Sequence, residues 1–135
     1  MAAMEYILVY KGRNWPSDID GPNVALTVVR QGEYFQFYIA LFPSAGALDL
    51  VAGPGPHPHG AGDRWYQALT SAAIEEIERD IRDGHQPDAD ESKRINARFI
   101  HPDPARVRAL ERANHPLPEI RDGLFAGIEV ARIQI

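Results

Sequence analysis

The sequence contains no cysteine, so the protein can form neither a disulfide bond nor a metal site built on thiolates. Nothing in the composition calls for an oxidising compartment, and we expect a cytoplasmic protein. The chain also lacks any run of about 18 apolar residues, the length that a membrane-spanning helix needs. Residues 1–5 lack the basic segment and the long apolar run of a secretory signal. These absences favour a protein that folds around its own apolar core, away from membranes.

The sequence also has fewer basic than acidic residues. The chain has 14 Lys and Arg residues against 19 Asp and Glu residues, which gives a formal net charge of -5 at pH 7. Phosphate backbones and anionic membrane surfaces are bound through clustered Lys and Arg, so neither nucleic acid nor a membrane is an expected partner. A protein partner, and a basic one in particular, suits this charge better. The 135 residues are expected to form a single domain, residues 1–135.

Two apolar runs within residues 23–42 predict a long β-hairpin that turns at Gln31 and Gly32. Both faces of the first run are apolar, which is typical of a central strand. One face of the second run is expected to face the core, and its residues are Phe35, Phe37, Ile39 and Leu41. Tyr34 and Tyr38 share the opposite face, where they either lie beneath a helix or form an open docking surface.

Further elements follow from the spacing of apolar residues. Strands are predicted at Tyr6–Tyr10, Arg94–His101 and Leu124–Ile135, a long helix at residues 63–83 and a short helix at Pro104–Ala113. Residues 43–62, rich in Pro and Gly, are expected to form a long loop, and residues 85–93 a flexible connector.

Two of these strands allow more detailed expectations. Within Arg94–His101 the alternating residues Ile95, Ala97 and Phe99 are expected to face the core. In the last strand the alternation changes phase at Ala131, which predicts a β-bulge. The order strand-strand-strand-helix-strand-helix-strand indicates an α+β fold. We expect a mostly antiparallel five-stranded sheet with one long and one short helix packed on one face.

The most specific local pattern is His57-Pro58-His59. In an extended segment the two imidazoles lie on the same side and can share a metal ion, with Asp63 as a candidate third ligand. The spacing of the other histidines does not force them to converge on this pair. Exposed histidines in a polar loop are therefore the simpler interpretation, and no cofactor is expected.

Catalytic motifs are absent from the sequence. None of the serines lies in a G-x-S-x-G setting, so no catalytic residue is predicted. Arg94, Arg98 and Arg132 are candidates for a small cationic patch on the exposed face of the last two strands, able to bind a carboxylate or a phosphate. Pairing of these arginines with nearby acidic residues is the more ordinary alternative.

These observations favour a small acidic protein-binding module of the inhibitor or immunity type, which neutralises or regulates another protein. Its candidate docking residues are Tyr34, Tyr38, Glu75, Glu76 and Asp80. A solvated helix face is the ordinary alternative for the three acidic residues.

Two other functions remain open. One is a small enzyme, or a domain that binds a small molecule or a metal, with a site between the sheet and the loop 43–62 that uses His57, His59 and Asp63. The other is a structural subunit that forms a homodimer through the C-terminal strand, whose apolar residues would make an adhesive edge.

Overall fold

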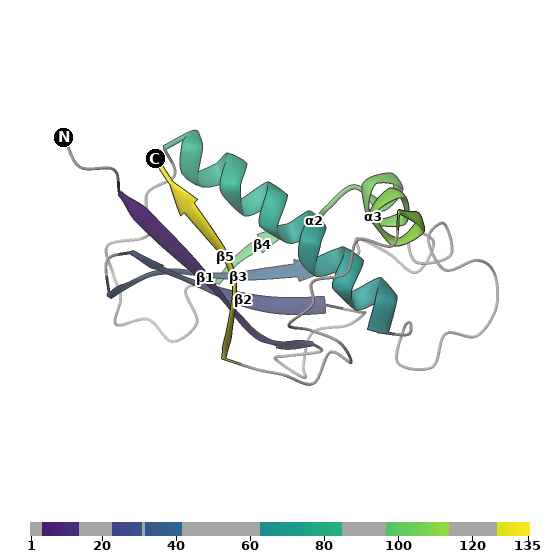
Figure 1. Cartoon of the computed structure of the whole chain (residues 1–135), viewed down its shortest axis with the longest axis horizontal. Helices are drawn as coiled ribbons and strands as arrows, with labels where there is room; N and C mark the ends of the chain where they lie inside the picture. Colours follow the sequence, from purple (N-terminus) through teal and green to yellow (C-terminus); the bar gives the residue numbers. More distant parts are fainter. Residues whose placement is uncertain (1–3, 14–22, 31, 42–62, 85–96, 114–126) are drawn as a thin grey trace.

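The computed structural model describes residues 4–13, 23–30, 32–41, 63–84, 97–113 and 127–135 (Figure 1). Their elements are β1 (Glu5–Arg13), β2 (Asn23–Arg30), β3 (Glu33–Leu41), α2 (Asp63–Arg82), β4 (Ala97–Ile100), α3 (Pro104–Arg112) and β5 (Ile128–Gln134). The predicted loop 43–62 and connector 85–93 lie outside the described residues. None of the described helices combines the length and the apolar character needed to cross a bilayer.

The five strands form one sheet in the order β4-β3-β2-β1-β5. Neighbours along β3-β2-β1-β5 are antiparallel, whereas β4 runs parallel to β3. The fold is therefore α+β as expected, but the sheet is mixed, which corrects the expectation of a mostly antiparallel sheet. The physical reason lies in the connection, because α2 separates β3 from β4 and a chain that crosses back through a helix can enter the next strand in the same direction.

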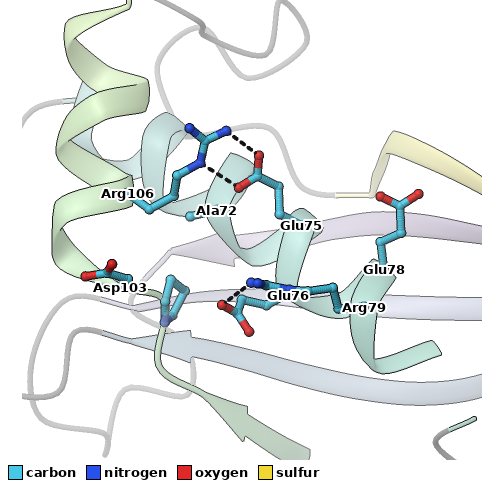
Figure 2. Close-up of a pocket in the computed structure, with 8 residues that line it drawn as sticks. Ala72, Glu75, Glu76, Glu78, Arg79, Asp103 and Arg106 are labelled. Carbon is cyan, nitrogen blue, oxygen red and sulfur yellow. Dashed lines mark hydrogen bonds and ion pairs between the residues drawn. The ribbon is translucent and has the colours of Figure 1, made fainter. Parts of the chain in front are cut away.

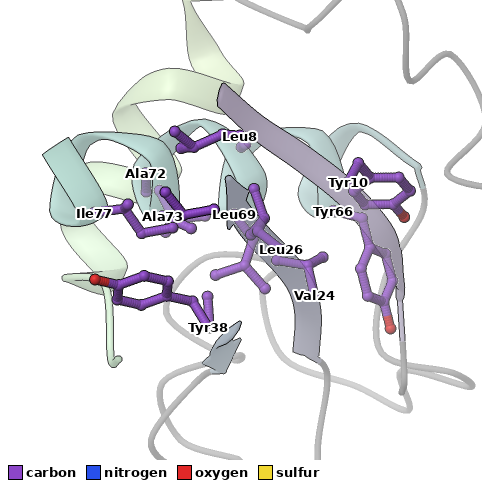
Figure 3. Close-up of a cluster of buried hydrophobic side chains, with 14 of the residues drawn as sticks. Leu8, Tyr10, Val24, Leu26, Tyr38, Tyr66, Leu69, Ala72, Ala73 and Ile77 are labelled. Atoms are coloured by element: carbon purple, nitrogen blue, oxygen red, sulfur yellow. The ribbon is translucent and has the colours of Figure 1, made fainter. Parts of the chain in front are cut away.

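Helix α2 covers one face of the sheet and closes the main core. Its stripe of residues spaced by four, Leu69, Ala73 and Ile77, has no exposed surface. Figure 3 shows this stripe against Val24 and Leu26 of β2, which are also fully buried. Helix α3 packs against α2, and its two buried residues extend the same core. The apolar residues that recur every 3.6 positions along the helix thus pack against those that recur every two positions along the strand. We call this contact the seam between α2 and β2.

The aromatic residues of strand β3 are divided between its two faces differently from the expected grouping, which placed Phe35, Phe37, Ile39 and Leu41 on one face. Tyr38 is fully buried in the main core, while Phe37 and Ile39 lie in a separate cluster with Ala25. Phe35 does join the main core. The cause is a bulge, because the pairing with β2 shifts by one residue around Phe35 and an extra residue reverses the side to which the next side chains point.

The two edge strands give one confirmation and one correction. In β5 the pairing with β1 shifts around Val130, so the predicted bulge is confirmed. In β4, Phe99 was expected to face the core, yet 52% of its surface is exposed. Phe99 pairs with Ile39, on the face that α2 does not cover, because β4 turns Arg98 toward the helix instead.

The seam between α2 and β2 predicts a large difference between buried and exposed apolar residues. Ile77→Ala should lower the free energy of unfolding by about 2–5 kcal/mol, because it leaves a cavity in a closely packed core. Phe99→Ala, at the half-exposed position, is the control and should cost less than about 1 kcal/mol. Urea denaturation measures both, and equal losses would contradict this placement of the core.

Candidate functional site

A groove of about 440 Å³ lies between the outer face of α2 and the start of α3. Its lining is mostly charged and consists of Ala72, Glu75, Glu76, Glu78, Arg79, Pro102, Asp103 and Arg106. Figure 2 shows these side chains in place, with the acidic groups of α2 along one wall. The groove holds four carboxylates and two guanidinium groups, so its lining carries an excess of negative charge.

The α3 side of the groove is formed by residues at the start of that helix. Asp103 caps the helix, and its carboxylate accepts a hydrogen bond of 3.0 Å from the backbone N–H of Ala105. Pro104 occupies the start of the helix, where its missing N–H costs nothing. Val107 and Leu110 anchor the helix in the core, and this anchorage holds the first turn against α2.

One ion pair bridges the two walls. Arg106 of α3 donates from Nε to one carboxylate oxygen of Glu75 at 2.9 Å and from Nη2 to the other at 2.7 Å. Figure 2 shows the two side chains pointing toward each other. This hydrogen bonding raises the pKa of Arg106, and the charge of Glu75 adds to the effect. Both groups are solvent-exposed, so the pair adds little stability, but its forked geometry fixes the orientation of the two groups.

The two other glutamates of the groove, Glu76 and Glu78, pair within α2. Arg79 bonds Glu76 one turn earlier, and Arg82 bonds Glu78 at 3.1 Å. Such exposed pairs are weak and exchange readily with other partners. The groove therefore offers carboxylates to a positively charged ligand. The described side chains that line it are otherwise two arginines, an alanine and a proline.

Asp80, on the last turn of α2, belongs to a different cluster. It accepts a hydrogen bond of 2.8 Å from the hydroxyl of Tyr38, and the guanidinium of Arg98 bonds both of its oxygens at 2.8 and 3.0 Å. Burial raises the pKa of Tyr38 far above its usual value, and the hydrogen bond to Asp80 adds to the rise. We call Tyr38, Asp80 and Arg98 the clasp, because they join the end of α2 to β3 and β4.

The candidate docking residues thus separate into three groups. Glu75 and Glu76 line the groove. Tyr38 has no exposed surface, so burial beneath a helix, the first of its two expected placements, describes it. Asp80 is bound within the clasp. The side chain of Tyr34 lies outside the described residues.

The proposed metal ligands remain without described geometry. His57 and His59 lie outside the described residues, and Asp63 is the first residue of α2 but its side chain is not among those described. Within the described part of the chain, no group of three or more His, Asp or Glu residues is placed to hold a metal ion. The metal hypothesis therefore stays a prediction.

Arg98 and Arg132, two of the three arginines of the candidate cationic patch, do not come together. Arg98 lies on β4 and Arg132 on β5, and these strands are the two opposite edges of the sheet. Each arginine is paired with acidic residues, Arg98 with Asp80 and Arg132 with Glu5. Arg94 lies outside the described residues. A shared patch would require β4 and β5 to be neighbours, and the strand order separates them. Pairing with acidic residues, the alternative interpretation, is confirmed for Arg98 and Arg132.

Sequence reasoning did not identify the α3 side of the groove. Pro102, Asp103 and Arg106 form this side, and none of them was among the candidate site residues, although the helix that begins at Pro104 was predicted. The helix start was a readable signal, whereas the contact between Arg106 and Glu75 joins residues 31 positions apart and has no local pattern.

The fold and the groove define a small α+β protein with an acidic cleft between its two described helices. Comparisons with protein-family models, with curated proteins and with solved structures find no match.

The clasp predicts a measurable role for one hydroxyl group. Tyr38→Phe should lower the free energy of unfolding by about 1.5–3 kcal/mol, because it leaves a charged acceptor without its buried donor. Tyr6→Phe is the matched control and should cost less than about 0.5 kcal/mol, since the edge-to-face contact of its ring with Phe35 does not need the hydroxyl. Chemical denaturation at pH 7 compares the two, and equal effects would contradict the clasp.

The raised pKa of Tyr38 predicts a loss of stability in alkali. The tyrosine pKa is about 10 in the unfolded chain and higher in the folded protein. Below pH 10 Tyr38 is protonated in both states; above pH 10 the unfolded chain loses this proton first, which favours unfolding. Between pH 10 and 11.5 the wild type should lose up to about 1.4 kcal/mol per pH unit more than Tyr38→Phe. Parallel stability profiles of the two proteins would contradict this.

Proposed function

We propose that the protein is a small cytoplasmic protein-binding module of the inhibitor or immunity type, and that it binds a basic partner through the groove between α2 and α3. The observation that carries this proposal is the excess of carboxylates over guanidinium groups in a cleft of about 440 Å³. A volume of that size suits one or two long side chains of a partner. The proposal accords with the net charge of -5.

The chemistry of the lining favours arginine or lysine as the inserted group. Ala72 and Pro102 are buried and form a small apolar floor, which can contact the methylene groups of a long basic side chain. Glu76 and Glu78 lie above it with carboxylates held by weak, exposed pairs. A partner's guanidinium can replace Arg79 or Arg82 on these groups at little cost, because it forms the same charge-assisted hydrogen bonds.

The negative field of the groove also favours rapid association. Complementary charge raises the rate at which two proteins meet, and it disfavours acidic competitors. An inhibitor benefits from both effects, since it must find its target before the target acts. The dependence on charge also implies that binding weakens as salt concentration rises.

Charge reversal in the groove tests the proposal. The double variant Glu76→Lys, Glu78→Lys should bind an arginine-rich peptide, and any basic protein captured by the wild type, at least about tenfold more weakly. Among the described residues this variant loses two ion pairs, both exposed and weak, so its fold should persist. Isothermal titration calorimetry at low and at moderate salt gives the dissociation constants.

The control reverses the same charge outside the groove. Asp83→Lys alters an exposed residue just beyond the end of α2 and should leave the affinity within about twofold of the wild type. Chemical shifts of the backbone amides should change near Glu76 and Arg106 when the peptide is added. Equal losses in both variants, or shifts confined to the other face of the sheet, would refute the groove as the binding site.

A further inference from the structure

Strand β5 forms one edge of the sheet. Among the described residues it pairs with β1 alone, so its outer side presents backbone groups without a neighbouring strand in that part of the chain. A row of backbone N–H and C=O groups at an edge is a template for another strand. The C-terminal Ile135, just beyond β5, keeps 46% of its surface exposed.

The register with β1 identifies which backbone groups point outward. Met4 and Ile135 exchange two backbone hydrogen bonds of 2.9 and 3.0 Å, and this pattern recurs at every second residue of an antiparallel ladder. Counting along β1 from Met4, the residues whose backbone groups bond β5 are therefore those at positions 4, 6 and 8. Ile7 and Val9 belong to the alternate set, which does not bond β5. Their opposite residues, Arg132 and Glu129, accordingly turn their N–H and C=O groups away from β1.

The bulge gives this outer edge an unusual charge pattern. Three positions separate Glu129 from Arg132, and in a regular strand they would lie on opposite faces. The extra residue, Val130, brings both onto the same face, where Arg132 donates hydrogen bonds to Glu129 and, at 2.8 Å, to Glu5. The hydrogen bond from Arg132 lowers the pKa of Glu129, in keeping with a charged pair. An acid and a base thus lie side by side, both with outward backbone groups.

We infer that β5 binds β5 of a second copy of this chain, antiparallel about a two-fold axis, in the register that places Glu129 opposite the partner's Arg132. In this register each copy contributes one acid and one base, so the axis creates two identical pairs of opposite charge. The same register places Ile128 opposite the partner's Ile133, on the helix-covered side of the sheet. The two sheets would become one continuous sheet.

A bulge at an edge usually protects a sheet from association, because it bends the strand away from would-be partners. Here the bulge lies at the centre of the proposed pairing, so that Val130 faces the partner's Ala131 and the two bulges match across the axis. If the charges of β5 served to prevent association, like charges would face each other across the two-fold axis. In this register opposite charges face each other. On pairing, Arg132 would leave the exposed carboxylate of its own Glu129 for that of Glu129 in the second copy. This exchange costs little, because exposed ion pairs are weak.

Single cysteines test both the dimer and its register, because the chain has no cysteine of its own. In a homodimer of Glu129→Cys each thiol faces an arginine, and in one of Arg132→Cys each thiol faces a glutamate. A disulfide should therefore form when the two variants are mixed under mild oxidation, and much less when each is alone. A purification tag on one variant separates the mixed dimer on a non-reducing gel. The untagged wild type should sediment as a dimer.

The control pair is Glu129→Cys mixed with Gln134→Cys, which shifts the register by two residues and should give at most a few per cent of the cross-linked product. Circular dichroism shows whether each variant remains folded. A wild type that sediments as a monomer at every concentration tested would overturn the inference. Equal cross-linking of the matched and shifted pairs would overturn it too, because it would indicate random collision instead of strand pairing.

Discussion

The packing of α2 on one face of the sheet is the interaction on which the other described features depend. The helix is 20 residues long, and the residues of its inner stripe, Leu69, Ala73 and Ile77, have no exposed surface. Because a helix is rigid, fixing its inner face also fixes its outer face. Glu75 and Glu76 line the groove for that reason, and α3 reaches the core by packing against the same helix. The groove between α2 and α3 is thus a consequence of the way the core positions α2.

The clasp sets the position of α2 along its axis. An acidic residue in the last turn of a helix is unfavourable, since the helix dipole places negative charge there. Asp80 is tolerated because Tyr38 donates a hydrogen bond from β3 and Arg98 supplies a positive charge from β4. A sliding helix would lose both interactions, whereas apolar contacts alone allow small shifts. This explains why a tyrosine occupies a core position where a phenylalanine would fill almost the same volume.

Much of the fold could be predicted from local pattern, and the failures share one physical cause. The helix start at Asp103 and the bulge in β5 were readable because capping and alternation are local properties. The separation of Phe35 from Phe37 and Ile39 was not, because one bulged residue reverses the faces of β3 and no local pattern marks it. Strand order is equally non-local. For the groove, the sequence supplied Glu75 and Glu76 but not their partner Arg106, which depends on how two helices meet.

The exposed ion pairs contribute more to shape than to stability. An exposed pair is worth about 0–1 kcal/mol, so the network around α2 cannot be what holds the helix in place. The fork between Glu75 and Arg106 nevertheless shows that the walls of the groove lie at the separation that a carboxylate and a guanidinium require. A partner's arginine approaching Glu76 or Glu78 would meet carboxylates on the same rigid helix. The groove therefore combines a fixed frame, set by the core, with ion pairs weak enough to be exchanged, and that combination favours reversible recognition of a basic surface.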